Sequence, residues 1–140
     1  MEIDDALTFL RDHRNGVLTT IKRDGRPQLS NIIYAVQDDG TIDISVTAPR
    51  AKTRNAARDP RVSLHVSRDD FYAYAVVDGD AELSPVSTEP GDAAGLRLQA
   101  LYRQLIGEHD NWDEYLQAMV DDQRQVLTIR PTHAYGMLPS

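Results

Sequence analysis

Apolar and polar residues alternate along much of the chain, in short runs that end at turn-forming residues. This period of two predicts β-strands, because successive side chains of a strand point to opposite faces. The predicted strands span residues 16–23, 27–37, 41–47, 61–67, 71–86 and 125–131, the last followed by a tail. Asp24-Gly25 predicts a tight hairpin turn. We expect the run 71–86 to bend near Asp78-Gly79 or to split there into two paired strands.

Apolar residues recur at helical spacing in four other segments. The predicted helices span residues 2–13, 51–59, 92–107 and 112–121. Short antiparallel strands joined by tight turns, with few helices, favour a barrel over a doubly wound sheet. We therefore expect a mainly β protein of the α+β class, folded as a single domain over residues 1–140.

The composition of the chain excludes several classes of functional site. The chain has no cysteine, which excludes disulfides, a thiol nucleophile and cysteine-bound zinc or iron–sulfur clusters. Its four histidines lie far apart, so we expect no metal site. Glycine motifs for nucleotides and the G-x-S-x-G motif of hydrolases are missing, and nothing singles out a catalytic triad.

The N-terminal segment 1–10 is acidic and has no cationic region before an apolar run, which argues against a signal peptide. No stretch approaches the roughly 18 apolar residues of a membrane helix. We expect a cytoplasmic protein without a membrane partner.

Charge is unevenly distributed. The formal net charge of −7, from 22 acids and 15 bases, argues against binding to nucleic acid. However, the window 50–61 holds five of the cations, and Asp59 is its single acid. The window begins where a predicted strand ends and a predicted helix starts, and free N–H groups at a helix start attract anions.

A phosphate at this helix start would explain the cations, because arginine clamps phosphate and lysine supplies a point charge. The candidate ligands are Arg50, Lys52, Thr53 and Asn55, with Arg26 in the preceding hairpin turn as a remote partner. The alternative is a solvated basic helix, neutralised by the acidic stretch 108–122.

Polar and aromatic residues on the strands form a second candidate group. Ser30-Asn31 interrupts an apolar strand, and the pair could form hydrogen bonds with the polar edge of a bound ring. Alternatively, one residue faces water and the other bonds a neighbouring strand. Other candidates are Tyr72 with Tyr74, which share a face of an extended strand, and His133 with Tyr135 in the tail. Such aromatic residues also serve in cores and dimer interfaces.

Together these segments resemble a known family. The matching pieces are GVLTTIKRDGRPQLSN, PRAKTRNAARDPR, YAVVDGDAEL, LYRQLIGEHDNWDEYLQAM and the final THAYG, in family order. They resemble the pyridoxamine-phosphate-oxidase-like split-barrel superfamily, and more narrowly the flavin/deazaflavin oxidoreductases that use coenzyme F420. The resemblance implies a six-stranded antiparallel split β-barrel with short flanking helices, and a homodimer with two cofactor sites at the subunit interface.

The resemblance also implies roles for single residues. It assigns the cofactor phosphate to Arg50, Lys52, Thr53 and Asn55, with Arg26 near the phosphate or the polar tail. It lays Gln28, Ser30 and Asn31 along the ring system, with Thr47 at the end of the neighbouring strand. It implies that Tyr72, Tyr74, His133 and Tyr135 come from the second subunit. It assigns no catalytic side chain.

The chain departs from the family at its end. Members that oxidise pyridoxamine phosphate carry a basic signature there, whereas this tail has only Arg130 and His133, which argues against that activity. The expected function is an F420-dependent oxidoreductase, in which reduced deazaflavin gives a hydride to a small electron-poor acceptor. The alternatives are an FMN-dependent oxidase or flavin reductase of the same fold, and a non-catalytic F420 or flavin carrier.

Overall fold

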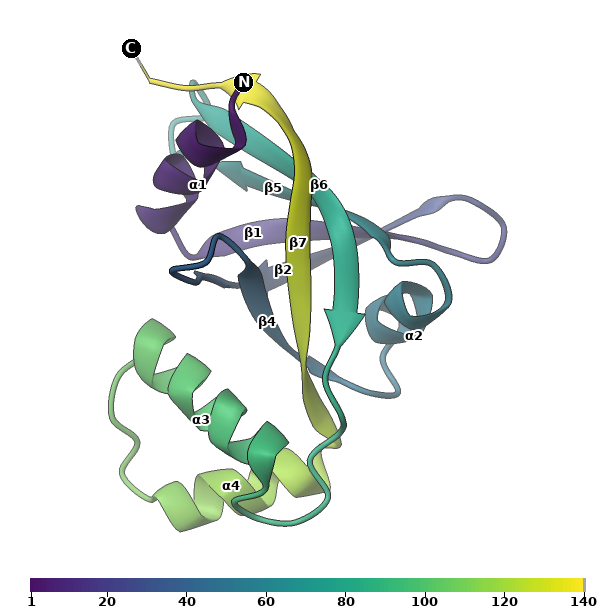
Figure 1. Cartoon of the computed structure of the whole chain (residues 1–140), viewed down its shortest axis with the longest axis vertical. Helices are drawn as coiled ribbons and strands as arrows, with labels where there is room; N and C mark the ends of the chain where they lie inside the picture. Colours follow the sequence, from purple (N-terminus) through teal and green to yellow (C-terminus); the bar gives the residue numbers. More distant parts are fainter. Residues whose placement is uncertain (140) are drawn as a thin grey trace.

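The structure, a computed structural model, describes residues 1–139 as one curled antiparallel sheet with four helices packed around it (Figure 1). The helices are α1 (Ile3–Arg11), α2 (Ala51–Arg58), α3 (Ala93–Leu105) and α4 (Trp112–Asp121). The strands are β1 (Asn15–Ile21), β2 (Pro27–Ile33), β3 (Ala35–Val36), β4 (Ile42–Thr47), β5 (Arg61–Ser67), β6 (Tyr74–Leu83) and β7 (Arg124–Met137). Among the described residues, no helix is both long and apolar enough to cross a membrane.

The strands follow the order β2-β1-β5-β6-β7-β4-β3, and every pairing is antiparallel. The sheet curls around one core, whose centre is a row of paired residues: Leu18, Leu64, Val77 and Ala134, each at most 1% exposed. The predicted antiparallel split barrel is therefore confirmed. The predicted strand number is wrong, because the sheet of residues 1–139 has seven strands rather than six.

The seventh strand arises from a break in the predicted strand 27–37. Tyr34 separates β2 from β3, and its side chain enters the core, where its hydroxyl donates to the Leu10 carbonyl at 2.7 Å. Its backbone N–H donates to the Arg14 carbonyl at 3.0 Å instead of to a strand. The alternation of apolar residues continues across Tyr34, so the pattern alone did not reveal the break.

Strand β6 starts three residues later than predicted. Phe71 has φ +66° and lies in a tight turn, where its N–H donates to the Arg68 carbonyl. Residues 71–73 therefore lie outside the strand. The predicted bend near Asp78-Gly79 is confirmed as a shift in the pairing of β6 with β7.

Strand β7 is twice as long as predicted, and the expected tail is part of it. Pro131 and Gly136 lie in that segment, and both residue types are typical of strand ends. Pro131 is accommodated beside the shift in pairing, where it lies opposite Gly79. At Gly136 an added Cβ would collide with the Tyr74 carbonyl of β6, so the pairing of the two strands there requires a glycine.

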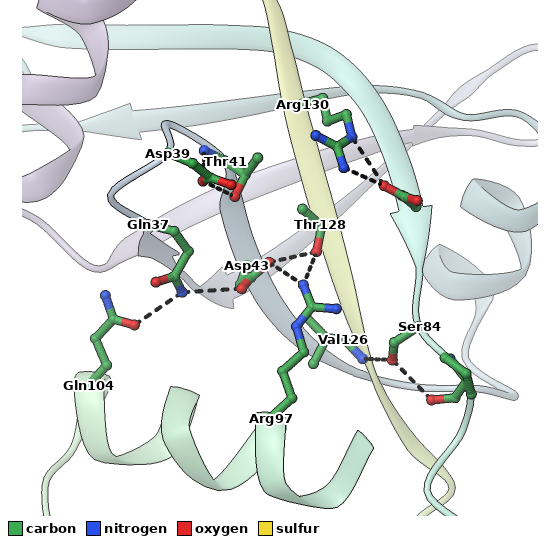
Figure 2. Close-up of polar contacts among 12 residues, drawn as sticks. Gln37, Asp39, Thr41, Asp43, Ser84, Arg97, Gln104, Val126, Thr128 and Arg130 are labelled. Atoms are coloured by element: carbon green, nitrogen blue, oxygen red, sulfur yellow. Dashed lines mark hydrogen bonds and ion pairs between the residues drawn. The ribbon is translucent and has the colours of Figure 1, made fainter. Parts of the chain in front are cut away.

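The α3–α4 hairpin covers the outer face of β4 and of the first half of β7 (Figure 1). Leu98, Tyr115 and Met119 pack there against Val126 in a second, smaller core. The hairpin is also fixed by a polar network in which Arg97 of α3 donates to Asp43 Oδ1 at 3.1 Å and to Thr128 Oγ1 at 2.6 Å (Figure 2).

Asp43 is 6% exposed and is the centre of that network. Thr128 Oγ1 donates to it at 2.6 Å, and Gln37 donates from the other side at 3.1 Å. Gln37 also bonds Gln104, at the far end of α3. A buried carboxylate is tolerated only with such partners. The network therefore holds α3 in place along its length.

Acid is expected to loosen the start of α3 through Asp92, the residue that caps this helix. The backbone N–H groups of Thr88 and Gly95 donate to its carboxylate at 2.9 and 2.8 Å and, with Ser87, lower its pKa from 3.8 to about 2. A depressed carboxylate pKa stabilises the fold above the unfolded pKa and ceases to do so as the pH falls to the folded one. Stability should therefore fall between about pH 4 and pH 2.

This dependence is measurable by urea unfolding at a series of pH values. Asp92→Asn should flatten the fall in unfolding free energy between pH 4 and pH 2, whereas Asp110→Asn, on the exposed loop before α4, should leave it as in the parent chain. Equal slopes for the Asp92→Asn variant and the parent would contradict this role.

Candidate cofactor site

Helix α2 begins without any of the groups that usually satisfy a helix start. Its N-cap residue is Arg50, which makes no capping hydrogen bond, and its first turn contains no acid. The first N–H groups of a helix have no partner within the helix, and they carry partial positive charge. The start of α2 is therefore open to an anion.

Three cations gather at this helix start. Burial and the charges of Arg50 and Arg124 lower the pKa of Lys52. Arg124 enters from β7, where it lies opposite Thr47 at the end of β4, and the Arg50 N–H donates to the Thr47 carbonyl at 3.2 Å. No carboxylate of residues 1–139 forms an ion pair with any of the three. Mutual repulsion among these three cations destabilises the fold, and a bound anion would relieve it.

Arg124 is the residue that reasoning from the sequence missed. It lies about sixty residues beyond the end of the basic window and comes next to it only through the pairing of β4 with β7. Its one signal was its position as the single base at the start of a predicted strand, directly after an acidic stretch.

Thr53 and Asn55 lie on the buried side of α2, at 2% and 7% exposure. The Asn55 amide donates to Thr20 Oγ1 at 3.2 Å, and its oxygen accepts from Arg58 at 3.0 Å, so this side chain is engaged within the fold. Thr53 differs, because its hydroxyl is buried and has no hydrogen-bond partner within residues 1–139. An unpartnered hydroxyl in the first turn of α2 is free to donate a hydrogen bond to an anion bound there.

The basic window is divided between two sides of α2. Arg54 and Arg58 line a cavity of about 710 Å³ together with Lys22 and Arg23 of the β1–β2 hairpin. Arg58 also donates to the Ile21 carbonyl at 2.7 Å, which ties α2 to that hairpin. We call this cavity the basic groove. Arg26 is exposed at the end of the same hairpin turn.

The two adjacent polar residues of β2 face opposite ways. Ser30 and Gln28 pair with Leu18 and Thr20, which are fully buried, so they lie on the inner face of the sheet. Asn31 pairs with Val17 on the outer face and is exposed. Ser30 and Asn31 therefore face opposite sides of the sheet within one chain, and their place along the ring system stays a prediction.

Asn31 lies instead on the same sheet face as the aromatic residues of the predicted tail. One row of directly paired residues crosses the outer face: Asn31, Val17, His65, Val76 and Tyr135. His133 lies in the next row opposite Asp78, and the Tyr74 ring lies 5.6 Å from the His65 ring. Tyr72 precedes β6 at 78% exposure and does not share a strand face with Tyr74.

The predicted site residues thus form two groups. Thr47, Arg50 and Lys52 meet at the start of α2, where the arrangement can bind an anion such as a phosphate. Asn31, Tyr74, His133 and Tyr135 lie on the outer face. The described part of the chain contains no cluster of histidine and acidic side chains able to hold a metal ion.

Comparison with solved structures gives several proteins of the same fold. A conserved hypothetical protein from Mycobacterium tuberculosis is 27% identical, with a TM-score of 0.74, over 100% of this chain and 90% of that one. An F420 reductase is 25% identical, with a TM-score of 0.71, over 91% and 94%. A heme-binding protein from Mycobacterium smegmatis, at 21% identity and a TM-score of 0.66, shares the fold over 96% of this chain and 53% of that one.

The family described as Pyridoxamine 5'-phosphate oxidase matches residues 3–138, a range that contains every strand, the open start of α2 and both groups of site residues. The curled antiparallel sheet and these matches agree with the resemblance drawn from the sequence. The chain belongs to the pyridoxamine 5'-phosphate oxidase family.

Proposed function

We propose that the chain is an F420-dependent oxidoreductase whose cofactor phosphate binds at the start of α2. The observation that carries this proposal is the uncapped helix start, surrounded by Arg50, Lys52 and Arg124 without a counter-charge. The free N–H groups and Lys52 would hold the phosphate, and the unpartnered Thr53 hydroxyl suits the same ligand.

The basic groove favours F420 over FMN. F420 carries carboxylates beyond its phosphate, whereas FMN ends at the phosphate. Lys22, Arg23, Arg54 and Arg58 line the groove on the other side of α2, where Asp24 is the one acid of the lining. Such a surface would attract an anionic tail. The likeness to an F420 reductase at 25% identity supports the same choice.

The bound deazaflavin would supply the hydride, and the protein would supply position and electrostatics. Ser30 and Gln28 lie on the inner face of the edge strand β2, where their side chains could bond the polar edge of a ring. The acceptor is proposed to be a small electron-poor molecule such as a conjugated enone.

Titration of the purified chain with F420 and with FMN, followed by ligand fluorescence, tests the cofactor. We expect micromolar or tighter binding of F420 and weaker binding of FMN. A panel of conjugated enones with reduced F420 then tests turnover by the return of the absorbance of oxidised F420. Failure of both cofactors to bind would overturn the proposal, and binding without turnover would favour a carrier.

We also propose that the chain forms a homodimer through its outer sheet face. Apolar side chains are exposed there on β2, at the β5–β6 turn and on β7: Leu29, Ile33, Phe71, Tyr135 and Met137. A cavity of about 540 Å³ hollows the same face between Asn31, His65 and Phe71. Several exposed apolar side chains on one face indicate an interaction site, and a second copy offers the self-complementary surface of a two-fold dimer.

Sedimentation velocity checks the dimer. The parent chain should sediment as twice 15.7 kDa, and the double variant Leu29→Asp, Met137→Asp as a monomer. Leu96→Asp is the matched control, since Leu96 is an exposed leucine of α3 outside this face, and it should remain dimeric. A monomeric parent chain, or a dimer that survives the double variant, would contradict the proposal.

A further inference from the structure

A further cavity lies under the α3–α4 hairpin, between it and strands β2 and β4. It measures about 270 Å³. Its walls are mostly apolar, formed by Leu98, Leu101 and Leu105 of α3, Ile106 directly after it, Met119 of α4 and Ile33 of β2. We call it the hairpin pocket. The Asp43 network and the second core fix the helices that form it, so the pocket is preformed rather than a loose gap (Figure 2).

One charged side chain, Arg124, lines this pocket, and its Nε donor lacks an acceptor among the described residues. Arg124 Nε is buried and has no hydrogen-bond partner within residues 1–139, and Nη1 makes only a long bond of 3.4 Å to Ser45 Oγ. Tyr115 shares the lining but does not neutralise Arg124, because burial raises the pKa of Tyr115 to about 12 and its hydroxyl donates to the Leu98 carbonyl. A buried guanidinium donor without an acceptor is costly.

We propose that the hairpin pocket binds a small carboxylic acid with an apolar body, whose carboxylate accepts hydrogen bonds from Arg124 while its hydrocarbon part lies among the leucines. A planar carboxylate matches the donors of an arginine, and the apolar walls exclude a fully polar anion. The volume corresponds to roughly nine waters at liquid density, which is room for an acid of about eight carbons. The inference goes beyond the proposed function and does not depend on a cofactor.

Methionine methyl resonances provide a direct readout. The chain has three methionines, of which Met119 lines the hairpin pocket while Met1 and Met137 are exposed elsewhere. In a chain labelled with ¹³C-methyl methionine, octanoate should shift the Met119 resonance in a saturable way and leave the other two unchanged. Octanol has the same body without the charge and should bind at least tenfold more weakly.

The variant Arg124→Gln should weaken octanoate binding at least tenfold and leave octanol binding unchanged. Arg130→Gln is the matched control on the same strand, because Arg130 is exposed and pairs with Glu82, and it should bind octanoate as the parent chain does. If Arg124→Gln does not fold, the comparison of octanoate with octanol on the parent chain decides alone.

Two outcomes would overturn the proposal: no saturable Met119 shift up to the solubility of octanoate, or equal affinity for octanol. Conversely, octanoate binding in a chain that binds neither F420 nor FMN would support the hairpin pocket while refuting the proposed function.

Discussion

Replacing Lys52 with alanine is expected to weaken the binding of both F420 and FMN by about tenfold to a hundredfold, the effect of losing one charge-assisted hydrogen bond to a phosphate. Lys52 is held beside Arg50 and Arg124 at a pKa lowered by burial and by their charges. Its removal relieves repulsion, so the unfolding free energy should stay the same or rise. Fluorescence titration and urea unfolding of the same sample measure both quantities.

Lys22→Ala is the matched control, since Lys22 and Lys52 are the two lysines of the chain. Lys22 lies in the basic groove on the other side of α2. Its loss should leave FMN binding unchanged and weaken F420 binding, because only F420 extends beyond the phosphate. Unchanged affinity of Lys52→Ala for both cofactors would refute the assignment of the phosphate to the start of α2.

Gly79→Ala should lower the unfolding free energy by about 3 kcal/mol, near the upper end of what overpacking costs. A Cβ at Gly79 would collide with the Arg130 carbonyl and approach Ile129 Cγ2 to 2.7 Å. Both contacts belong to the core of the sheet at the shift between β6 and β7, so neither can yield cheaply. Urea unfolding at neutral pH gives the value.

Gly25→Ala separates this collision from the general cost of replacing glycine. Gly25 has φ +85° in the open β1–β2 turn, with nothing within 4 Å of an added Cβ. It should cost only about 1–2 kcal/mol, the penalty of a left-handed conformation for a residue with a Cβ. A loss for Gly79→Ala no greater than that for Gly25→Ala would show that the strands yield at the shift.

The local structure and the cations at the start of α2 could be predicted from the sequence. Alternation located five of the strands to within a few residues, and helical spacing located α3 and α4. The basic window was correctly placed at the start of a helix that follows a strand, because Pro49 and the cations after it mark that junction. These features depend on residues that are close together in the chain, so the periodicity of the sequence predicts them.

What the sequence could not show depends on pairing between distant segments. Arg124 comes close to Lys52 only because β7 lies beside β4. Likewise, Pro131 and Gly136 would end a strand in isolation but fit one whose partner is shifted or has room for a glycine. Whether such a residue fits depends on the paired strand, which the sequence of β7 alone does not reveal.

The length of β7 limits which residues one ligand can touch. Arg124 stands at its first position and Tyr135 near its last, so at about 3.3 Å per residue they are roughly 35 Å apart along the strand. That span is longer than a tricyclic ring with a phosphate arm. If a cofactor bound at Lys52 also touches Tyr135, that tyrosine comes from a second chain, and diluting the protein into monomers should lower its affinity for the cofactor.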